Sequence, residues 1–459
     1  MRVYFHTFGC RANQYDTDVV RQRFSDDGAV VVDDPAVADI AIINSCTVTH
    51  ESEVKLRRFV RHVAKSGAAQ TIVMGCAAAL DDGSIAALPS VRAVVANADP
   101  DSVLRAAGIE AARIEARPAA PLRLHGKYRA LLKIQDGCDE HCTFCATTIA
   151  RGNNRSRPVA ELIEEARRLA EHHAEIVITG VHIGTYGQDR FSDPGRKPGE
   201  NQNRGQESLA QGENQNRGQE SLAQGDNQDP GLESLALGNP RAGARGQNTL
   251  GRLLEALIAA VPQVRFRLSS VEATEVDDTL AHLFIEAPRN LAAHLHAPLQ
   301  SGSNRVLKRM GRHWYTAESY RARIEWLAER LPVFGLGADV IAGFPGETED
   351  DHQASLTLLH ALPFTYLHVF PFSVRPDAPA AKLPAQLPQA TISARARQLR
   401  ELGEAKARAY RARRVGEQAD GVVSGRRGGQ VDVLTEDYLS VYLPIDRWDG
   451  RPRLAITVD

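Results

Sequence analysis

Three cysteines with a spacing suited to metal binding stand at Cys138, Cys142 and Cys145, directly after the apolar segment 131–134. This C-x3-C-x2-C run places three thiolates on one loop, where they can bind three irons of a [4Fe–4S] cluster. The fourth iron then has no protein thiolate, and its open coordination position is typical of a reactive site rather than a structural one. A zinc site with His141 or a more distant residue as fourth ligand is the alternative that the spacing leaves open.

The other three cysteines, Cys10, Cys46 and Cys76, are far apart in the sequence, but each follows an apolar run and a small residue. Loops at the carboxyl ends of parallel strands open on one edge of a sheet, so these cysteines could meet in space. All six cysteines lie in the first third of the chain. In a reducing cytosol this usage favours metal binding or catalysis over structural disulfides.

The composition argues against binding of nucleic acid through the overall charge and against a membrane-spanning protein. The 459 residues include 55 Lys and Arg and 57 Asp and Glu, so the formal net charge is −2. Contact with a nucleic acid must therefore use local basic patches rather than the charge of the whole protein. The sequence contains neither a basic stretch leading into an apolar signal region nor an apolar run of about 18 residues, which a membrane span requires. We expect a cytoplasmic enzyme that does not cross a membrane.

The elements that must position the cysteines follow from the alternation of apolar runs, which predicts an α/β protein. Residues 1–120 alternate short apolar runs with helical stretches and predict a parallel α/β domain. Residues 125–390 repeat this alternation on a larger scale and predict an incomplete (β/α)6 barrel, with active groups at its strand ends. The candidate barrel strands are 131–135, 175–179, 265–269, 294–298, 336–341 and 366–370.

A low-complexity segment, 191–248, interrupts the predicted barrel. A 13-residue unit occurs at 199–211 and 212–224, and again in degraded form at 225–237. The unit is rich in Gly, Asn and Gln, and its apolar surface is too small to offset the entropy lost on ordering. We predict a disordered insertion; a repeat solenoid is less favoured because these units are shorter than the usual helical repeats.

Two further segments close the chain. Residues 391–414 predict a basic linking helix, in which 392–414 has eight Lys or Arg and two Glu, a net charge of +6. Residues 415–459 predict a small antiparallel β-barrel, whose five Arg and eight Asp or Glu give a net charge of −3. The helix could contact RNA phosphates, although a solvated charged face is the commoner meaning of such runs. A second basic patch comprises Arg57, Arg58, Arg61, His62 and Lys65.

The loop that holds Cys138, Cys142 and Cys145, with Phe144 before the third cysteine, resembles the cluster motif of the radical S-adenosylmethionine (SAM) superfamily. The resemblance implies that SAM binds the open iron and is cleaved reductively to a 5′-deoxyadenosyl radical. Further segments that are similar to this family's barrel are 179–187, 267–272, 298–303 and 339–348.

The segments 8–16, 44–49 and 74–76 resemble the N-terminal signature of the methylthiotransferases. The C-terminal barrel is similar to a TRAM domain, an RNA-binding module of this family, but is shorter. The resemblance implies two [4Fe–4S] clusters and SAM as cofactors. The second cluster would be held by Cys10, Cys46 and Cys76.

The barrel resemblance also implies a SAM pocket, in which glycines permit close backbone approach and polar side chains offer hydrogen-bonding partners. Its residues would be Phe144, Thr179, Gly180, Ser270, Glu272, Gln300, Ser301, Ile341 and Gly343. The histidines His182, His294 and His296 could indicate another metal site. We expect them to pack in the core or the pocket, because the cysteines account for both clusters.

Three arginines follow the cluster loop, and they resemble the family's Arg-Gly-x-x-Arg-Ser-Arg stretch. The resemblance implies that Arg151, Arg155 and Arg157 lie near the reacting base and contact RNA. The segment 146–149 departs from the family, whose members tend to carry bulkier apolar residues and a proline there.

Within the family, the chain looks most like the branch that inserts a methylthio group at C2 of N6-threonylcarbamoyladenosine at position 37 of tRNA. The partners implied are the anticodon loop of tRNA and an electron donor such as flavodoxin or ferredoxin. Methylthiolation of N6-isopentenyladenosine or of a ribosomal-protein aspartate are alternatives within the same chemistry. A non-catalytic RNA-binding protein with structural metal sites is the alternative from another class, and it predicts no cleavage of SAM.

Overall fold

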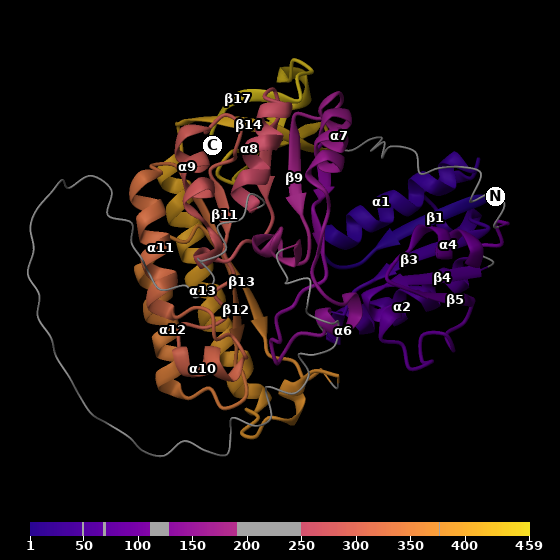
Figure 1. Cartoon of the computed structure of the whole chain (residues 1–459), viewed down its shortest axis with the longest axis horizontal. Coiled ribbons are helices and arrows are strands. Elements are labelled where there is room, and N and C mark those ends of the chain that lie inside the picture. Colours follow the sequence, from indigo (N-terminus) through magenta and orange to yellow (C-terminus); the bar gives the residue numbers. More distant parts are fainter. Residues whose placement is uncertain (48–49, 68–69, 111–127, 191–248, 376) are drawn as a thin grey trace, which may run out of the picture.

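The structure, a computed structural model, describes residues 1–47, 50–67, 70–110, 128–190, 249–375 and 377–459 (Figure 1). The repeats and the insertion predicted at 191–248 lie outside the described residues. Within the described part, no helix is both long enough and apolar enough to cross a membrane.

The N-terminal part is a parallel sheet of five strands in the order β2-β1-β3-β4-β5, which confirms the predicted parallel α/β arrangement. The central strand β3 is buried at every position and rich in Ile, as is usual for a parallel strand covered on both faces. Apolar clusters lie on both faces, one under α1 and α4 and one under α2 and α3. The strands are β1 (Arg2–Thr7), β2 (Val30–Val32), β3 (Ile40–Ser45), β4 (Gln70–Gly75) and β5 (Val91–Ala96), and the helices are α1 (Arg11–Asp26), α2 (His50–Ser66), α3 (Cys76–Ala79) and α4 (Pro100–Ala106).

Six parallel strands form the incomplete barrel, and all six candidate strands occur in the structure. Two three-stranded sheets, β6-β9-β10 and β11-β12-β13, are joined by the parallel bridges Phe266–Leu291 and Ser270–His296. The strands are β6 (Ala130–Lys133), β9 (Glu175–Thr179), β10 (Arg265–Leu268), β11 (His294–His296), β12 (Gly335–Ala342) and β13 (Tyr366–Pro371).

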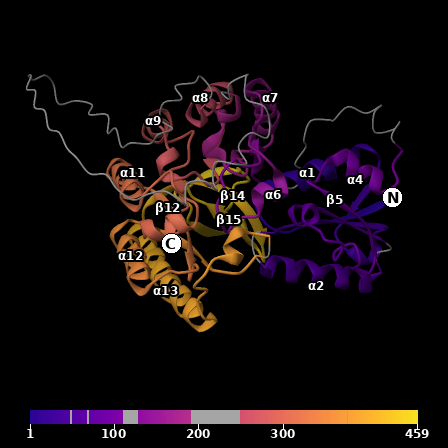
Figure 2. The same cartoon turned by 60° about the horizontal axis from the view of Figure 1, so that its bottom comes forward.

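Helices lie in an arc around the barrel strands (Figure 2). Side-chain caps define where several of them begin: Thr316 caps α11, and Thr348 caps α12 through a reciprocal pair with Asp351. The helices are α7 (Val159–Ala170), α8 (Leu250–Ala260), α9 (Asp278–Glu286), α10 (Asn304–Arg309), α11 (Ala317–Arg330) and α12 (Glu349–Ala361). The loop with the clustered cysteines lies between β7 (Gln135–Asp136) and α6 (Thr147–Arg151), which precedes β8 (Arg155–Ser156).

The last part of the chain is a helix followed by a curled antiparallel half-barrel with strand order β16-β15-β14-β17. The antiparallel prediction is confirmed. Among the described residues, however, no ladder joins β16 to β17, so the sheet stays open. The elements are α13 (Gln389–Arg414), β14 (Gln418–Arg427), β15 (Gln430–Leu434), β16 (Ser440–Pro444) and β17 (Arg453–Thr457).

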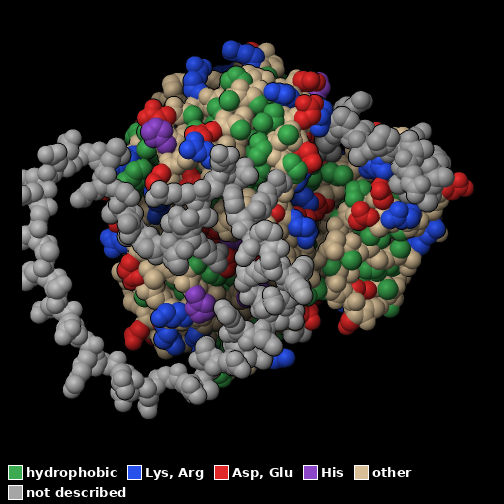
Figure 3. Space-filling model, viewed as in Figure 1, with side chains coloured by type: hydrophobic (Ala, Val, Ile, Leu, Met, Phe, Trp, Pro, Cys, Tyr) green, Lys and Arg blue, Asp and Glu red, His purple; other side chains and the backbone are tan. Residues whose placement is uncertain are grey.

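The basic helix predicted at the barrel exit, now α13, has most of its positive charge neutralised. Arg395 pairs with Glu347, and Arg414 pairs with Asp437, at 2.7 and 2.9 Å. In the described part of the chain, Arg400 has no carboxylate within 4 Å of its guanidinium. On the visible face, Lys and Arg side chains are interspersed with Asp and Glu rather than gathered (Figure 3). Any phosphate contact by this helix therefore depends on a few unpaired arginines.

A fully buried ion network joins the barrel to the half-barrel. Glu175 of β9 accepts from Arg265 and Arg267 of β10 at 2.7 and 3.1 Å, and all three side chains have no exposed surface. The two guanidinium groups also donate to backbone carbonyls of the half-barrel, among them those of Leu434 and Thr435. Although burial favours the neutral acid, Arg267 and Arg265 hold the pKa of Glu175 well below its usual range.

Replacing Glu175 by Gln would leave the buried guanidinium group of Arg267 without a counter-charge and that of Arg265 with Asp420 alone, at 3.1 Å. We expect the Glu175→Gln variant to lose roughly 3–5 kcal/mol of unfolding free energy at neutral pH, measured by urea denaturation. Because the folded-state pKa is lowered, the carboxylate stabilises the fold above its ordinary pKa and less as pH falls below it. The difference between wild type and variant should therefore shrink at acid pH.

The matched control is Glu164→Gln, at a carboxylate that is 59% exposed and paired with Arg168 at 3.0 Å. An exposed pair of this kind contributes at most about 1 kcal/mol. Equal losses in the two variants would contradict a structural role for the buried network.

Candidate active site

A cavity of about 1300 Å³ lies between the N-terminal sheet and the barrel. Residues from both parts line it, so neither part forms the site alone. The cysteines at its wall are Cys10, Cys46, Cys76 and Cys145.

The three N-terminal cysteines converge because they follow neighbouring parallel strands. Cys10 follows β1 and precedes α1, Cys46 follows β3, and Cys76 follows β4 as the first residue of α3. Gly9, at φ +98°, lies so close to Cys46 that an added Cβ would stand 2.7 Å from its sulfur. A glycine there allows the two cysteine loops to touch, and the predicted meeting of these residues at one sheet edge is observed.

Asn13 and Arg151 are shared neighbours of this triad. The Asn13 side-chain oxygen lies 3.9 Å from the Cys10 sulfur and 3.8 Å from the Cys76 sulfur. It also accepts from Arg151 at 2.6 Å, while Arg151 Nε donates to the Cys76 sulfur at 3.1 Å. Because Arg151 ends the helix that follows Cys145, this contact ties the barrel loop to the N-terminal triad.

The second triad, Cys138, Cys142 and Cys145, lies on a loop held by backbone hydrogen bonds. Cys138 N donates to the Gly152 carbonyl at 3.0 Å, which closes the loop at its base. Gly137 has φ +71°, and an added Cβ would overlap the Asn153 carbonyl. The backbone N–H of Thr147 points at the Cys145 sulfur, at 3.3 Å. These contacts fix the path of the loop that carries the three sulfur atoms.

A buried guanidinium stands beside one thiol of each triad. Burial raises the pKa of Cys76 to about 11 and that of Cys142 to about 12, and the neighbouring guanidinium groups act in the opposite direction. The partners are Arg151 for Cys76 and Arg312 for Cys142, the latter at 3.5 Å. Such thiols stay protonated at neutral pH unless a metal replaces the proton.

Glu272 lies behind the second triad and is almost fully buried. Its carboxylate accepts from Arg312 and from the indole N–H of Trp314. His182 stands beside it, with one ring nitrogen 3.5 Å from the Cys138 sulfur and the other 2.7 Å from Glu275. Charged groups and cysteine sulfur are thus linked in one buried network.

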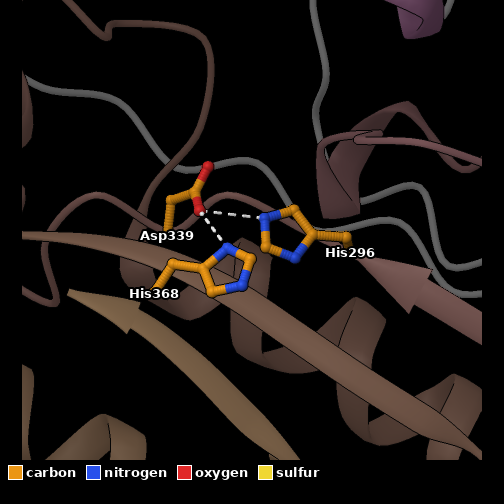
Figure 4. A group of neighbouring side chains, drawn as sticks. All are labelled: His296, Asp339 and His368. Carbon is orange, nitrogen blue, oxygen red and sulfur yellow. Dashed lines mark hydrogen bonds and ion pairs between the residues drawn. The ribbon is translucent and has the colours of Figure 1, made fainter. Parts of the chain in front are cut away.

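A second group of titratable side chains lines the cavity at the barrel strands. Asp339 accepts from His296 at 3.0 Å and lies 3.3 Å from His368 Nδ1 (Figure 4). Burial acts against ionisation of this carboxyl, but the two histidines hold the pKa of Asp339 well below its usual range. Like the group of His182, Glu272 and Glu275, its ligand atoms lie within 4.8 Å of one another, as a metal site requires. In the first group, His296 and Asp339 already satisfy each other by a hydrogen bond, whereas His182 Nε2 faces Glu275 at 2.7 Å as an ion-pair contact.

The residues implied for a SAM pocket divide into two sets. The first lines the cavity and consists of Phe144, Thr179, Gly180 and Ser270. The second lies behind the cavity wall: Glu272, Gln300, Ser301, Ile341 and Gly343. Among the second set, Gly343 has φ +76° and contacts Ile392, which itself lines the cavity.

The three arginines that follow the cysteine loop differ in exposure. Arg151 is 7% exposed and pairs with Asp16 and Asp136 at 2.8 Å each, so its donors are engaged within the protein. Arg157 pairs with Glu165 at 2.7 Å. The Arg155 side chain is 60% exposed, which makes it the most accessible of the three to RNA.

The sequence analysis assigned no role to Asn13, Arg312 or Tyr438, which the structure places at this site. Asn13 lies within a segment whose resemblance was noted, so that motif pointed to it. Arg312 and Tyr438 carry no local pattern, because their partners Cys142 and Arg11 are 170 and 427 residues away.

Comparison with known proteins identifies the family. The N-terminal part, residues 2–96, matches the family described as Uncharacterized protein family UPF0004, and residues 132–192 match the Radical SAM superfamily. Threonylcarbamoyladenosine tRNA methylthiotransferase MtaB of Bacillus subtilis is 32% identical over 89% of this chain and 81% of that protein. The chain belongs to the radical-SAM methylthiotransferase family.

Other relatives and a solved structure agree with this assignment. MtaB of Aquifex aeolicus is 29% identical over 96% of both chains. The tRNA-2-methylthio-N(6)-dimethylallyladenosine synthase of Mycobacteroides abscessus is 28% identical over 99% of this chain and 85% of that protein. The radical SAM methyltransferase TsrM from Kitasatospora setae shares the fold, with TM-score 0.54 and 13% identity over 83% of this chain and 75% of that chain. The family uses SAM and a [4Fe–4S] cluster, and its members are transferases.

Gly137, at the base of the cysteine loop, has no room for a side chain, so the addition of one methyl group should disturb the loop. In a Gly137→Ala variant, the new Cβ meets the Asn153 carbonyl, so the loop cannot close as it does here. We expect iron bound after anaerobic reconstitution to fall by about four atoms per chain, while the far-UV circular dichroism is unchanged.

Gly83→Ala is the control, because Gly83 has φ +95° but no atom within 4 Å of an added Cβ. It tests backbone strain alone, at a cost of about 1 kcal/mol. Full iron content in Gly137→Ala would show that the loop tolerates the change.

Proposed function

We propose that this chain transfers a methylthio group to C2 of N6-threonylcarbamoyladenosine at position 37 of tRNA. The observation that carries the proposal is that one cavity is lined by the whole N-terminal cysteine triad and by Cys145 of the barrel triad. The MtaB relatives are named for this tRNA base, which supports the choice of substrate. A cavity of about 1300 Å³ also has room for a modified base beside a cofactor.

Each triad has a donor set that suits a [4Fe–4S] cluster with one iron free of protein ligands. The barrel cluster would be held by Cys138, Cys142 and Cys145. The second would be held by Cys10, Cys46 and Cys76. When bound, the barrel cluster with SAM supplies a 5′-deoxyadenosyl radical, and the second cluster with another SAM supplies the methylated sulfur. A reducing partner such as flavodoxin or ferredoxin would provide the electron.

The chain's own residues would orient these components and exclude water. Arg151 holds the N-terminal triad against the loop of the barrel triad. Arg312 and Glu272 form a buried charge pair beside Cys142 and would hold the loop of the barrel triad in position for the cluster. Phe144, Thr179, Gly180 and Ser270 would contact SAM along the cavity wall.

The target base must leave its stack, because C2 faces into a paired or stacked helix. Turning out a base costs a few kcal/mol, least in a loop such as the anticodon loop. Arg155 and Arg400 are exposed, and Arg400 also lines the cavity. We infer that these two side chains contact phosphates of the anticodon loop and help to offset that cost.

Replacing one triad at a time separates the two proposed clusters. Wild type should bind about eight irons per chain after anaerobic reconstitution, and each triple Cys→Ala variant about four. The Cys10, Cys46 and Cys76 variant should still form 5′-deoxyadenosine from SAM but transfer no methylthio group. The variant of the other triad serves as its counterpart and should form no 5′-deoxyadenosine.

Mass spectrometry of tRNA nucleosides from cells lacking the gene, with and without the restored gene, tests the substrate. Restoration of 2-methylthio-N6-threonylcarbamoyladenosine is expected. If only 2-methylthio-N6-dimethylallyladenosine is restored, the substrate is instead the one named for the dimethylallyladenosine synthase relatives.

A further inference from the structure

The cavity is lined by three arginines in different electrostatic settings: Arg11, Arg151 and Arg400. Arg151 is buried and neutralised by two aspartates. Arg400 is exposed to solvent on α13. Arg11 is half-buried in the first turn of α1, and in the described chain no carboxylate lies within 4 Å of its guanidinium.

A neutral group fixes Arg11 in place. Arg11 Nη2 donates to the Tyr438 hydroxyl at 3.1 Å. Tyr438 reaches the cavity from the half-barrel, at φ +73°, and stacks on His294 with ring centroids 4.3 Å apart. A phenol orients the guanidinium but does not cancel its charge, so the cation is held ready for an anion.

The chemistry of the proposed substrate supplies that anion. A threonylcarbamoyl group ends in a carboxylate, whereas a dimethylallyl group is a hydrocarbon. A guanidinium binds a carboxylate through two parallel hydrogen bonds, and partial burial strengthens the pair. A pocket for the apolar group gains nothing from a half-buried cation, because burying an unpaired charge is unfavourable.

The position of Arg11 beside Cys10 agrees with the geometry of the base. In adenine, N1 lies between C6 and C2, so a ureido group on N6 that folds toward N1 brings its carboxylate to the side of the ring that carries C2. The reacting C2 must face the sulfur-supplying triad, to which Cys10 belongs under the proposed function. A cation next to Cys10 can therefore reach the carboxylate while C2 reaches the sulfur.

We propose that Arg11 is a specificity-determining residue that binds the threonyl carboxylate of the substrate base, with Tyr438 orienting its guanidinium. This inference rests on the proposed function and names the group that distinguishes its substrate from the dimethylallyl one. It concerns recognition of the base and leaves the transfer chemistry as described above.

The test measures binding of reconstituted full-length protein to anticodon stem-loops by fluorescence anisotropy. Three stem-loops carry, at position 37, N6-threonylcarbamoyladenosine, the same base with the carboxylate converted to a carboxamide, or adenosine. Wild type should bind the carboxylate form about 10 to 100 times more tightly than the carboxamide form, as expected for a charged hydrogen-bonded pair. In Arg11→Gln this ratio should fall toward one, and Arg11→Lys should restore part of it.

Arg400→Gln is the control, because it removes a cavity-lining charge that we assign to phosphate. It should weaken binding of all three stem-loops by a similar factor and leave the ratio unchanged. The carboxamide comparison uses unaltered protein, so it stays informative even if an Arg11 variant fails to bind iron. A ratio near one in wild type, or an undiminished ratio in iron-loaded Arg11→Gln, would overturn the assignment of Arg11.

These outcomes are separate from failure of the proposed function. Wild type that methylthiolates the threonylcarbamoyl stem-loop without discriminating against its carboxamide form would retain the function and exclude the role of Arg11. In a parallel methylthiolation assay that adds a fourth stem-loop, with N6-dimethylallyladenosine at position 37, modification of this stem-loop alone would exclude both.

Discussion

Arg151 carries a buried positive charge at the boundary between the N-terminal sheet and the barrel, and such a charge is tolerated only when it is neutralised. Asp16 from α1 and Asp136 from the barrel side both pair with it at 2.8 Å. Lys133 of β6 also contacts both aspartates. Separating the two parts would leave Asp16 without a counter-charge, and Arg151 and Lys133 would then share Asp136 alone. The relative position of the parts, and hence of the two cysteine triads, is fixed by this requirement.

Close packing around two glycines of β12 also shapes the cavity. Gly337 in β12 lies against the ring of Tyr366, and Gly335 lies against the backbone of Asp437. A side chain at Gly335 would displace the half-barrel loop that brings Tyr438 to the cavity, and one at Gly337 would displace the Tyr366 ring, which lines the cavity. The half-barrel thus completes the wall of the site in addition to any contact with RNA. All three parts of the chain contribute residues to one cavity.

Much of this architecture could be predicted from local patterns. The strand predicted at 175–179 is β9 with the same bounds, and the one at 131–135 is β6, Ala130–Lys133. Parallel strands end at one edge, which is why three cysteines far apart in sequence could be expected together. These predictions rest on periodicity and chain connectivity, and both are visible in a single sequence.

Pairings between distant side chains were not predictable in this way. The net charge of +6 that the composition gives for 392–414 is largely neutralised by carboxylates of other elements, such as Glu347 and Asp437. Burial of Arg151 depends on partners up to 138 residues away, so its sequence context gave only the neighbourhood of the cysteine loop. Whether a small antiparallel sheet closes depends on its two edge strands meeting, and no local pattern encodes that meeting.

The attachment of the half-barrel has an evolutionary consequence. Arg265 and Arg267 grip it largely through main-chain oxygens, those of Asp420, Leu434, Thr435 and Glu436. Every amino acid supplies such an oxygen, so substitutions along this seam leave its acceptors in place. Homologues can then diverge widely in this module while keeping it docked in the same orientation. In a homologue, residues equivalent to Arg265, Arg267 and Glu175 would indicate a docked half-barrel more reliably than the sequence of the half-barrel itself.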